Sequence, residues 1–541
     1  MGKSKLKSEN STSFLKNILM LMFSQIVVKV LGLVYKVIIV DVEGFGNTGN
    51  GYYATGYQIY MVLLAVSSIG IPNVISKLVS ERTVTGDFKA AHRIFKTALC
   101  LFTGFGFFLF LLLFFGAEYI AENLLHASGV KYTLMVLAPA LCFVPASAVM
   151  RGYFAGLGSM KASSNSQIVE QFFNCVLSIG FVYSCVGKDT AIMAAAGNLS
   201  TTCACIIACS YLVLFYRKRR GDIKSECANQ EIATQKSTRK QIIFIILSVS
   251  IPITLSSLVS TANSAIDTVT VSRCVQNAFA SIILDASALE EKAMELYGIL
   301  QKAEIVTHLP LAVSATLCTA IVPAISSALA KNNKEEANSK ISSCVFISSL
   351  LIFPCMSGFV VLASPILHLL YPSVPEGSLI LQLLCIILPF SSLTYILNGI
   401  LYGIGKQHIP AIALAIGSVI KLGLNVWLMS IPQINIYGAV ISTIVYQTVV
   451  FIIETVVVYK AIAVRLDYIK CFIKPALASV VMGGAVLGVY KLFILSGSNA
   501  LATLCSILIG AVIYVCLLFI TKTFSKEDIK TIPFLKKLKF I

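Results

Sequence analysis

Long apolar stretches alternate with short polar ones along almost the whole chain, and their lengths predict membrane-spanning helices. About twenty apolar residues cross a bilayer as a helix, because a helix satisfies its own backbone hydrogen bonds in lipid. Such segments can be drawn at 14–40, 57–80, 91–115, 132–157, 164–187, 190–216, 241–271, 298–330, 340–363, 377–403, 409–430, 435–460, 471–495 and 499–522. The pattern therefore predicts an all-α polytopic membrane protein with about 14 transmembrane helices.

The polar stretches between these segments alternate in charge. Every second loop is rich in Lys and Arg, most of all 217–240, whereas the opposite loops 41–56, 364–376 and 431–434 contain neither. Basic loops stay in the cytoplasm, and an even number of crossings places both termini on one side. We therefore expect a multi-pass protein whose two termini are both cytoplasmic.

Composition supports this class and excludes others. Hydrophobic residues make up 57% of the chain and charged residues only 12%, against about 25% charged in soluble domains. The net charge of +17 follows the membrane-flanking loops, so we expect no nucleic-acid partner. The start of the chain lacks a small-residue cleavage site, which indicates a retained first helix. Cys203, Cys205 and Cys209 have no His or acidic companion, so no metal site and no cofactor are predicted.

Lys29 and Lys36 interrupt residues 24–40, the later part of the first apolar segment. Lys29 and Lys36 are seven residues apart, so they share one helical face about 10 Å apart along the axis. A lysine near the bilayer centre costs roughly 2.5–3.5 kcal/mol and normally faces a polar cavity or a partner. Lys36 is close enough to the helix end to extend its ammonium to the headgroups instead. A cationic stripe without a neighbouring acid on its face indicates that this helix binds an anion.

The basic stretch 217–240 follows six apolar segments, and weak internal similarity indicates a repeat on either side of it. Pro72-Asn-Val-Ile-Ser-Lys-Leu78 resembles Pro323-Ala-Ile-Ser-Ser-Ala-Leu329, and the pair Gly152 and Gly156 resembles Gly399 and Gly403. We therefore expect two six-helix lobes related by a pseudo-twofold axis, at 1–216 and 241–460, joined by the cytoplasmic loop 217–240 and followed by two more helices and a basic tail at 461–541. The two prolines and four glycines are candidate hinges, although each could serve packing alone.

Several short motifs together resemble the stage V sporulation protein B family, which is close to the MurJ lipid II flippases and belongs to the multidrug, oligosaccharidyl-lipid and polysaccharide exporters. They are Lys29-Val-Leu-Gly32-Leu-Val-Tyr-Lys36, Gly70-Ile-Pro72-Asn-Val-Ile-Ser76-Lys-Leu-Val-Ser-Glu81, Arg151-Gly-Tyr-Phe-Ala-Gly156, Ser166-Gln-Ile-Val-Glu170-Gln, Ile266-Asp267-Thr-Val-Thr-Val-Ser-Arg273 and Lys421-Leu-Gly-Leu-Asn425. The resemblance implies a transporter in the bacterial cytoplasmic membrane that flips an undecaprenyl-pyrophosphate-linked sugar to the outer leaflet. The family usually has arginine at the positions of Lys29 and Lys36, so this chain keeps the charge and loses the bidentate fork.

Other charged residues lie within apolar segments. Asp267 could pair with a lysine of the first helix or with Arg273, or bind a coupling cation, and Lys421 could line the second lobe or pair within its bundle. Glu454 lies near a helix end and is expected to reach water. The candidate substrate-binding residues are therefore Lys29, Lys36, Asp267, Arg273 and Lys421.

Two other functions remain open at this stage. A drug or cation antiporter of the same superfamily would need carboxylates deep in a lobe, where the first lobe offers lysines. A membrane-embedded glycosyltransferase or polymerase would need acidic or His-containing catalytic loops, and no such constellation occurs in the sequence, so we expect a transporter and not an enzyme. H⁺, Na⁺ and the membrane potential are all compatible with the sequence as the energy source, and a peptidoglycan, spore-cortex, capsular or teichoic precursor as the cargo.

Overall fold

The computed structural model describes residues 11–228, 238–331, 333–462 and 466–523. Within these ranges the chain forms helices and no strand, which confirms the all-α fold class. The chain divides into two compact units. The first unit holds residues 1–298 with the short segment 430–432, and the second holds 299–429 with 433–541.

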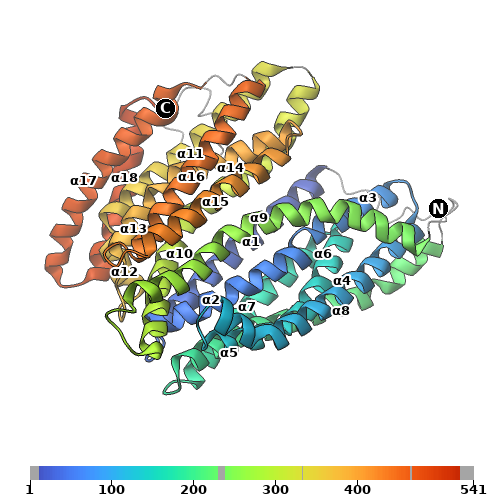
Figure 1. The fold of residues 1–541 in the computed structure, drawn as a ribbon. Coiled ribbons are helices and arrows are strands. Elements are labelled where there is room, and N and C mark those ends of the chain that lie inside the picture. The colour runs from blue at the N-terminus through green and yellow to red at the C-terminus, as the bar shows by residue number, and fades with distance from the viewer. Residues whose placement is uncertain (1–10, 229–237, 332, 463–465, 524–541) are drawn as a thin grey trace. The chain divides into compact units, whose positions relative to one another are not determined.

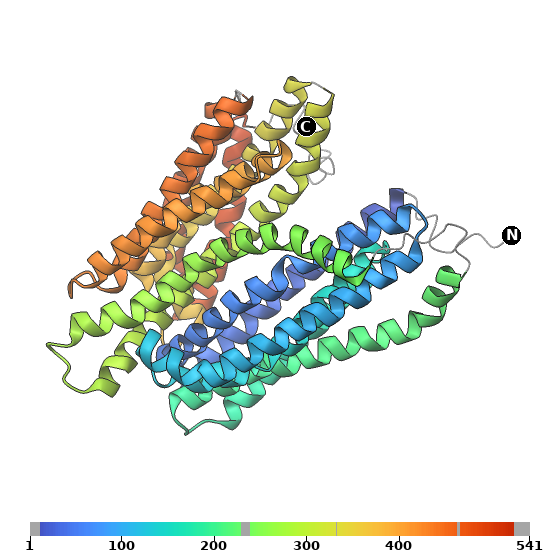
Figure 2. The ribbon, with the colours of Figure 1, turned by 45° about the vertical axis from the view of Figure 1, so that its right-hand side comes forward.

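The first unit is a bundle of long helices, and in Figure 1 they run from blue to green. Its helices are α1 (Ser11–Val40), α2 (Gly46–Leu64), η1 (Ala65–Ile69), α3 (Ile71–Val84), α4 (Phe88–Tyr119), η2 (Ile120–Leu124), α5 (Val130–Leu137), α6 (Ala140–Gly156), α7 (Lys161–Ser184), α8 (Thr190–Ala228) and α9 (Arg239–Phe279). A short turn then leads from α9 into α10, as the second view also shows (Figure 2).

The second unit is likewise helical. The helix α10 (Ala286–Ala330) begins in the first unit and continues into the second. The others are α11 (Lys334–Val361), α12 (Ala363–Leu370), α13 (Ser378–Cys385), α14 (Ile387–Gly403), α15 (His408–Met429), α16 (Ile436–Ile462), η3 (Ile469–Ile473), α17 (Lys474–Phe493), η4 (Ile494–Ser496) and α18 (Asn499–Ile520). The last two long helices, α17 and α18, pack against each other, and α17 packs against α11.

Every predicted apolar segment coincides with a helix or a pair of helices, but the total of fourteen crossings is not confirmed. Among the described residues, nine helices are long and apolar enough to cross a bilayer, and two bent helix pairs raise the number to eleven. The other three predicted segments coincide with α1, α7 and α9. The first turns of α7 contain Asn165, Gln167 and Glu170, and such polar side chains lower its mean hydropathy.

The basic stretch expected as a loop at 217–240 is in large part helical. The helix α8 has 39 residues and ends at Ala228, so at 1.5 Å per residue it is about 58 Å long, well beyond a hydrocarbon core of about 30 Å. Residues 229–237 lie outside the described part of the chain. The helix continues past the apolar segment because Arg and Lys have good helix propensity and need no lipid.

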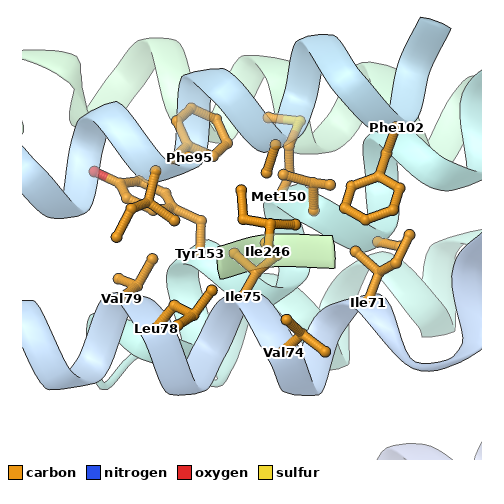
Figure 3. Close-up of a cluster of buried hydrophobic side chains, with 14 of the residues drawn as sticks. Ile71, Val74, Ile75, Leu78, Val79, Phe95, Phe102, Met150, Tyr153 and Ile246 are labelled. Carbon is orange, nitrogen blue, oxygen red and sulfur yellow. The ribbon is translucent and has the colours of Figure 1, made fainter. Parts of the chain in front are cut away.

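The core of the first unit joins buried side chains of α3, α4, α6, α7, α8 and α9. Figure 3 shows buried side chains of α3, α4 and α6, among them Ile75, Phe95 and Tyr153, packed together with Ile246 of α9. The rings of Phe95 and Tyr153 stack with their centres 4.2 Å apart. The helix α9 therefore belongs to the first compact unit, although it follows the basic stretch that the repeat suggests as a lobe boundary. A repeat is defined by sequence and a compact unit by packing, so the lobe boundary stays a prediction.

The predicted glycine pairs lie at close helix contacts in both units. A Cβ added to Gly152 of α6 would lie 2.7 Å from the carbonyl oxygen of Pro72 in α3. A Cβ added to Gly399 of α14 would lie 2.8 Å from the carbonyl oxygen of Cys318 in α10. The second glycine of each pair repeats this contact one turn later, with Gly156 against Ser76 and Val79 and Gly403 against Val322 and Ile325. The two units therefore share one helix-packing motif, in which Cys318 takes the place of Pro72.

The two prolines named as hinges have different settings. Pro72 lies in the first turn of α3, directly after the π-helical turn η1. Its missing N–H costs nothing at that position, because the N–H groups in the first turn of a helix have no carbonyl acceptor within the helix. Pro72 therefore starts a helix and does not interrupt one, which differs from the mid-helix position that the sequence suggested. Pro323 lies within the bounds of α10.

Candidate substrate-binding site

Lys29 and Lys36 of α1 differ in their surroundings. Lys29 is exposed, and within the described residues no hydrogen bond or ion pair engages its ammonium. Lys36 is partly buried, with its ammonium 5.5 Å from the ring centre of Tyr53 in α2. A cation over an aromatic face is attracted to it electrostatically. Of these two lysines, Lys29 is therefore the one available to a ligand.

The helix α1 is held by close packing and by tyrosine hydroxyls. A Cβ at Gly32 would lie 3.4 Å from the side-chain amide of Gln171 in α7, so the two helices pack closely between the two lysines. The hydroxyl groups of Tyr35 and Tyr53 lie 3.1 Å apart, and Asn198 of α8 donates to the carbonyl oxygen of Tyr53 at 3.0 Å. These contacts fix the rotation of α1 and therefore the direction in which Lys29 points.

A partly buried ion pair, which was not predicted as a site, lies in the same unit. Arg151 of α6 donates to Glu170 of α7 at 2.5 Å and to the hydroxyl of Ser166 at 2.9 Å. The side chain of Arg151 is 15% exposed and that of Glu170 is 32% exposed. Both residues stand in the motifs quoted above, but motifs on separate helices give no sign that their side chains pair. The ion pair neutralises the arginine charge, so Arg151 is less available to an anionic ligand than Lys29 is.

Arg273 lies on α9 and holds a neighbouring loop. Its guanidinium donates to the carbonyl oxygens of Leu124 and Asn123, and Gln276, one turn later, donates to the carbonyl oxygen of His126 at 2.7 Å. These bonds satisfy the last carbonyls of the π-helical turn η2. The geometry gives Arg273 a structural task, and its predicted role in substrate binding is not tested by these contacts.

Glu290, at the start of α10, holds the other end of the same loop. Its carboxylate accepts bonds from the backbone N–H groups of Ser128 and Gly129 and from the hydroxyls of Ser128 and Tyr52, all between 2.9 and 3.0 Å. Asp267, one and a half turns before Arg273, is buried at 4% exposure. Its predicted pairing with Arg273 is not among these bonds, and its role stays a prediction.

In the second unit, Lys421 of α15 is buried at 1% exposure. Its ammonium lies 5.6 Å from the ring centre of Tyr446 in α16. Asn425, one turn later, is fully buried. Burial of an amide and an ammonium within one turn gives this unit a polar centre, and whether Lys421 lines a cavity or pairs within the bundle stays a prediction.

A second buried lysine of this unit, Lys302 of α10, was not predicted as a site residue. Its side chain has no exposed surface, and its ammonium donates to the carbonyl oxygen of Val374 and lies 5.2 Å from the ring centre of Tyr371. Glu376 is 4.0 Å away. Lys302 therefore binds the 371–377 segment to α10, which is a structural use of a buried charge.

Glu454 of α16 differs from the prediction that it reaches water. The residue is completely buried, and neither carboxyl oxygen has a hydrogen-bond partner among the described residues. It lies eight residues before the end of α16, but packing of α14 and α15 against this helix covers it.

The helical membrane fold with charged side chains inside its apolar helices is typical of membrane transporters. The chain belongs to the polysaccharide biosynthesis protein family, whose model matches residues 14–329. The model for the lipid II flippase MurJ matches residues 261–510.

Individual relatives agree with these matches. Lipid II flippase MurJ of Bacillus subtilis (strain 168) is 26% identical over 449 residues, which cover 80% of each chain. Stage V sporulation protein B of the same organism is 25% identical over 540 residues, covering 97% of this chain and 99% of the relative. These matches confirm the resemblance seen in the short motifs, and with the apolar helices they make the chain a multi-pass membrane protein.

Solved structures show the same fold. A lipid II flippase MurJ in an inward closed conformation has a TM-score of 0.68 at 16% identity, covering 93% of this chain and 98% of the other. A multidrug resistance MATE family transporter in an inward-facing conformation has a TM-score of 0.66 at 14% identity, covering 80% of this chain and 94% of the other.

Proposed function

We propose that the chain is a flippase for an undecaprenyl-pyrophosphate-linked oligosaccharide, a precursor of peptidoglycan or of a related envelope polymer. It moves this cargo from the cytoplasmic to the outer leaflet by alternating access between two lobes, in the bacterial cytoplasmic membrane, with both termini in the cytoplasm. Support comes from the family match and from the likeness to a lipid II flippase. Lys36, Asp267, Arg273 and Lys421 remain candidate cargo contacts beside Lys29.

The observation that carries the proposal is the ammonium of Lys29, which is exposed and has no partner among the described residues. Inserting a lysine within an apolar helix into the membrane costs roughly 2.5–3.5 kcal/mol. Contacts of Gly32 and Tyr35 hold this part of α1 in place. A pyrophosphate is the part of the proposed cargo that offsets this cost, because it supplies the counter-charge. Lysine meets phosphate as a point charge without the planar fork of arginine.

The test is the transfer of a labelled undecaprenyl-pyrophosphate sugar across vesicles with matched protein content. Lys29→Arg retains transfer, because the charge remains and the guanidinium adds a bidentate fork. Lys29→Gln loses most transfer while inserting normally into the membrane. Lys29→Glu has the lowest transfer, because its carboxylate repels the anionic headgroup. Lys36 variants follow the same order with smaller effects, since Tyr53 already holds that ammonium.

The matched control is Lys188→Gln, which removes one exposed lysine from the connection between α7 and α8. It retains full transfer. Full transfer by Lys29→Gln contradicts the proposed contact and leaves Lys29 as a structural residue. Sugar transfer to an acceptor by the purified protein in the same vesicles would instead favour an enzyme.

A drug or cation antiporter is the second candidate. It is favoured by the MATE-type fold and by the buried carboxyl group of Glu454. Vesicles loaded with a cationic dye discriminate between the two: an antiporter exports the dye against an imposed ion gradient and leaves the lipid-linked sugar in its leaflet. A flippase transfers the lipid-linked sugar to the other leaflet and does not export the dye.

A further inference from the structure

The carboxyl group of Glu454 is buried without a partner. Its exposed fraction is 0%, and both of its oxygens lack a hydrogen-bond partner within the described part of the chain. The large majority of buried polar side-chain atoms in proteins have a partner, and an exception calls for an explanation.

Among the described residues around Glu454, none supplies a counter-charge. Those described side chains that interact electrostatically with Glu454 are Cys318 of α10 and Tyr402 of α14, both of which are neutral at ordinary pH. From α15, which packs along α16, the titratable residues are His408, which is exposed, and Lys421. Lys421 lies against Tyr446, eight residues and therefore about 12 Å before Glu454 along the helix.

The third packed helix, α13, contributes only the thiol of Cys385 as a titratable group. An isolated ionised carboxylate in such surroundings costs several kcal/mol even after relaxation, and binding a proton removes most of that cost.

We propose that Glu454 is a proton-binding site of the second unit, which carries its proton in this conformation and releases it when water reaches the carboxyl group. Release converts the carboxylic acid into a carboxylate and a hydrated proton, so no other reactant is needed. The ligand of the site is thus H⁺, and the site couples the transport cycle to a proton gradient. The coupling rests on the proposed transport function, whereas proton binding does not.

A polar line along the same helix contact supports access for water. Two turns before Glu454, Gln447 donates to Thr394 of α14 at 3.0 Å. On another face of α14, Ser392 forms a separate cluster of buried hydroxyls with Ser314 of α10 and Ser348 of α11. A contact lined by hydroxyl and amide groups accepts water at a smaller cost than an apolar one when the helices separate.

Infrared difference spectroscopy on the purified full-length protein tests proton binding directly. The wild type shows the C=O band of a protonated carboxyl group at neutral pH, and the band shifts on transfer to D₂O. Glu454→Gln lacks this band. Glu376→Gln, which changes a carboxylate that is 57% exposed, retains it. A wild type without the band, or a band that persists in Glu454→Gln, overturns the proposal.

Coupling is tested in vesicles with an imposed proton gradient. The gradient stimulates transfer of the lipid-linked sugar by the wild type and by Glu376→Gln, and the stimulation is lost in Glu454→Gln. Glu454→Asp keeps a carboxyl group and restores part of the stimulation by the gradient. This partial recovery separates a proton-binding role from a fault in folding. An unchanged gradient response in Glu454→Gln overturns the coupling. A wild type that moves no lipid-linked sugar contradicts the proposed flippase, while the infrared result still decides on proton binding.

Discussion

Alanine at Gly152 or Gly399 places a methyl group where the backbone of a neighbouring helix already lies. The added carbon would be 2.7 Å from a carbonyl oxygen in the first case and 2.8 Å in the second. These distances are several tenths of an ångström shorter than a normal contact between carbon and oxygen, and the obstacle is backbone, which cannot rotate away. The helices therefore have to move apart.

The size of the effect follows from a comparison with open positions. Overpacking at a close contact costs about 1–3 kcal/mol, and it outweighs the gain of roughly 1 kcal/mol that alanine has over glycine within a helix. Gly180 in α7 and Gly423 in α15 have no atom within 4 Å of an added Cβ. Alanine at these two positions therefore leaves the protein as stable as the wild type or more stable.

The assay is reversible unfolding of the purified protein in mixed detergent, with all four variants measured together. Gly152→Ala and Gly399→Ala lower the free energy of unfolding by similar amounts, because the contact is the same in both units. The hinge hypothesis adds that transfer per folded molecule also falls. If Gly152→Ala is as stable as Gly180→Ala, the close contact has been misjudged, and with it the motif shared by the two units.

Two further predictions concern the second unit and the topology. Lys302→Ala loses more stability than Lys302→Met in the same unfolding assay. Alanine leaves a cavity that costs about 2–5 kcal/mol, whereas methionine fills the space and removes a buried charge. Equal losses would mean that the charge of Lys302, and not its packing, determines the stability there. A reporter enzyme fused within 217–240 reads cytoplasmic and one within 364–376 reads external, and an external signal from 217–240 would overturn the predicted orientation.

Helices were predictable from the sequence because apolar length is a local property. The same property misplaced the end of α8, since hydropathy marks where lipid ends and not where a helix ends. Small-residue spacing correctly selected Gly152 and Gly399 as residues of interest. The spacing could not predict which residues these glycines contact. In the structure, Cys318 has the position next to Gly399 that Pro72 has next to Gly152, whereas the sequence similarity aligned Pro72 with Pro323.

Charged residues were harder to predict because their roles depend on partners from other helices. Arg151 and Glu170 are 19 residues apart on different helices, and their pairing is a tertiary contact. Glu454 is near a helix end, which suggested access to water, but the neighbouring helices bury it. Lys29 was selected from its own segment alone, since a lysine within an apolar stretch is visible in the sequence, and its role in binding stays a prediction.

The position of α9 has a consequence for biosynthesis. Ile242 and Ile246 of this helix belong to the core cluster, where Ile246 lies among side chains of α3, α4 and α6 (Figure 3), yet the ribosome makes them after all of the other helices in that core. Until they are inserted, the nascent chain presents an unfilled apolar surface that insertion factors or lipid have to cover. A truncated gene product that stops after α8 would keep this surface and be recognised by quality-control proteases. A fragment meant to fold by itself therefore has to extend through α9.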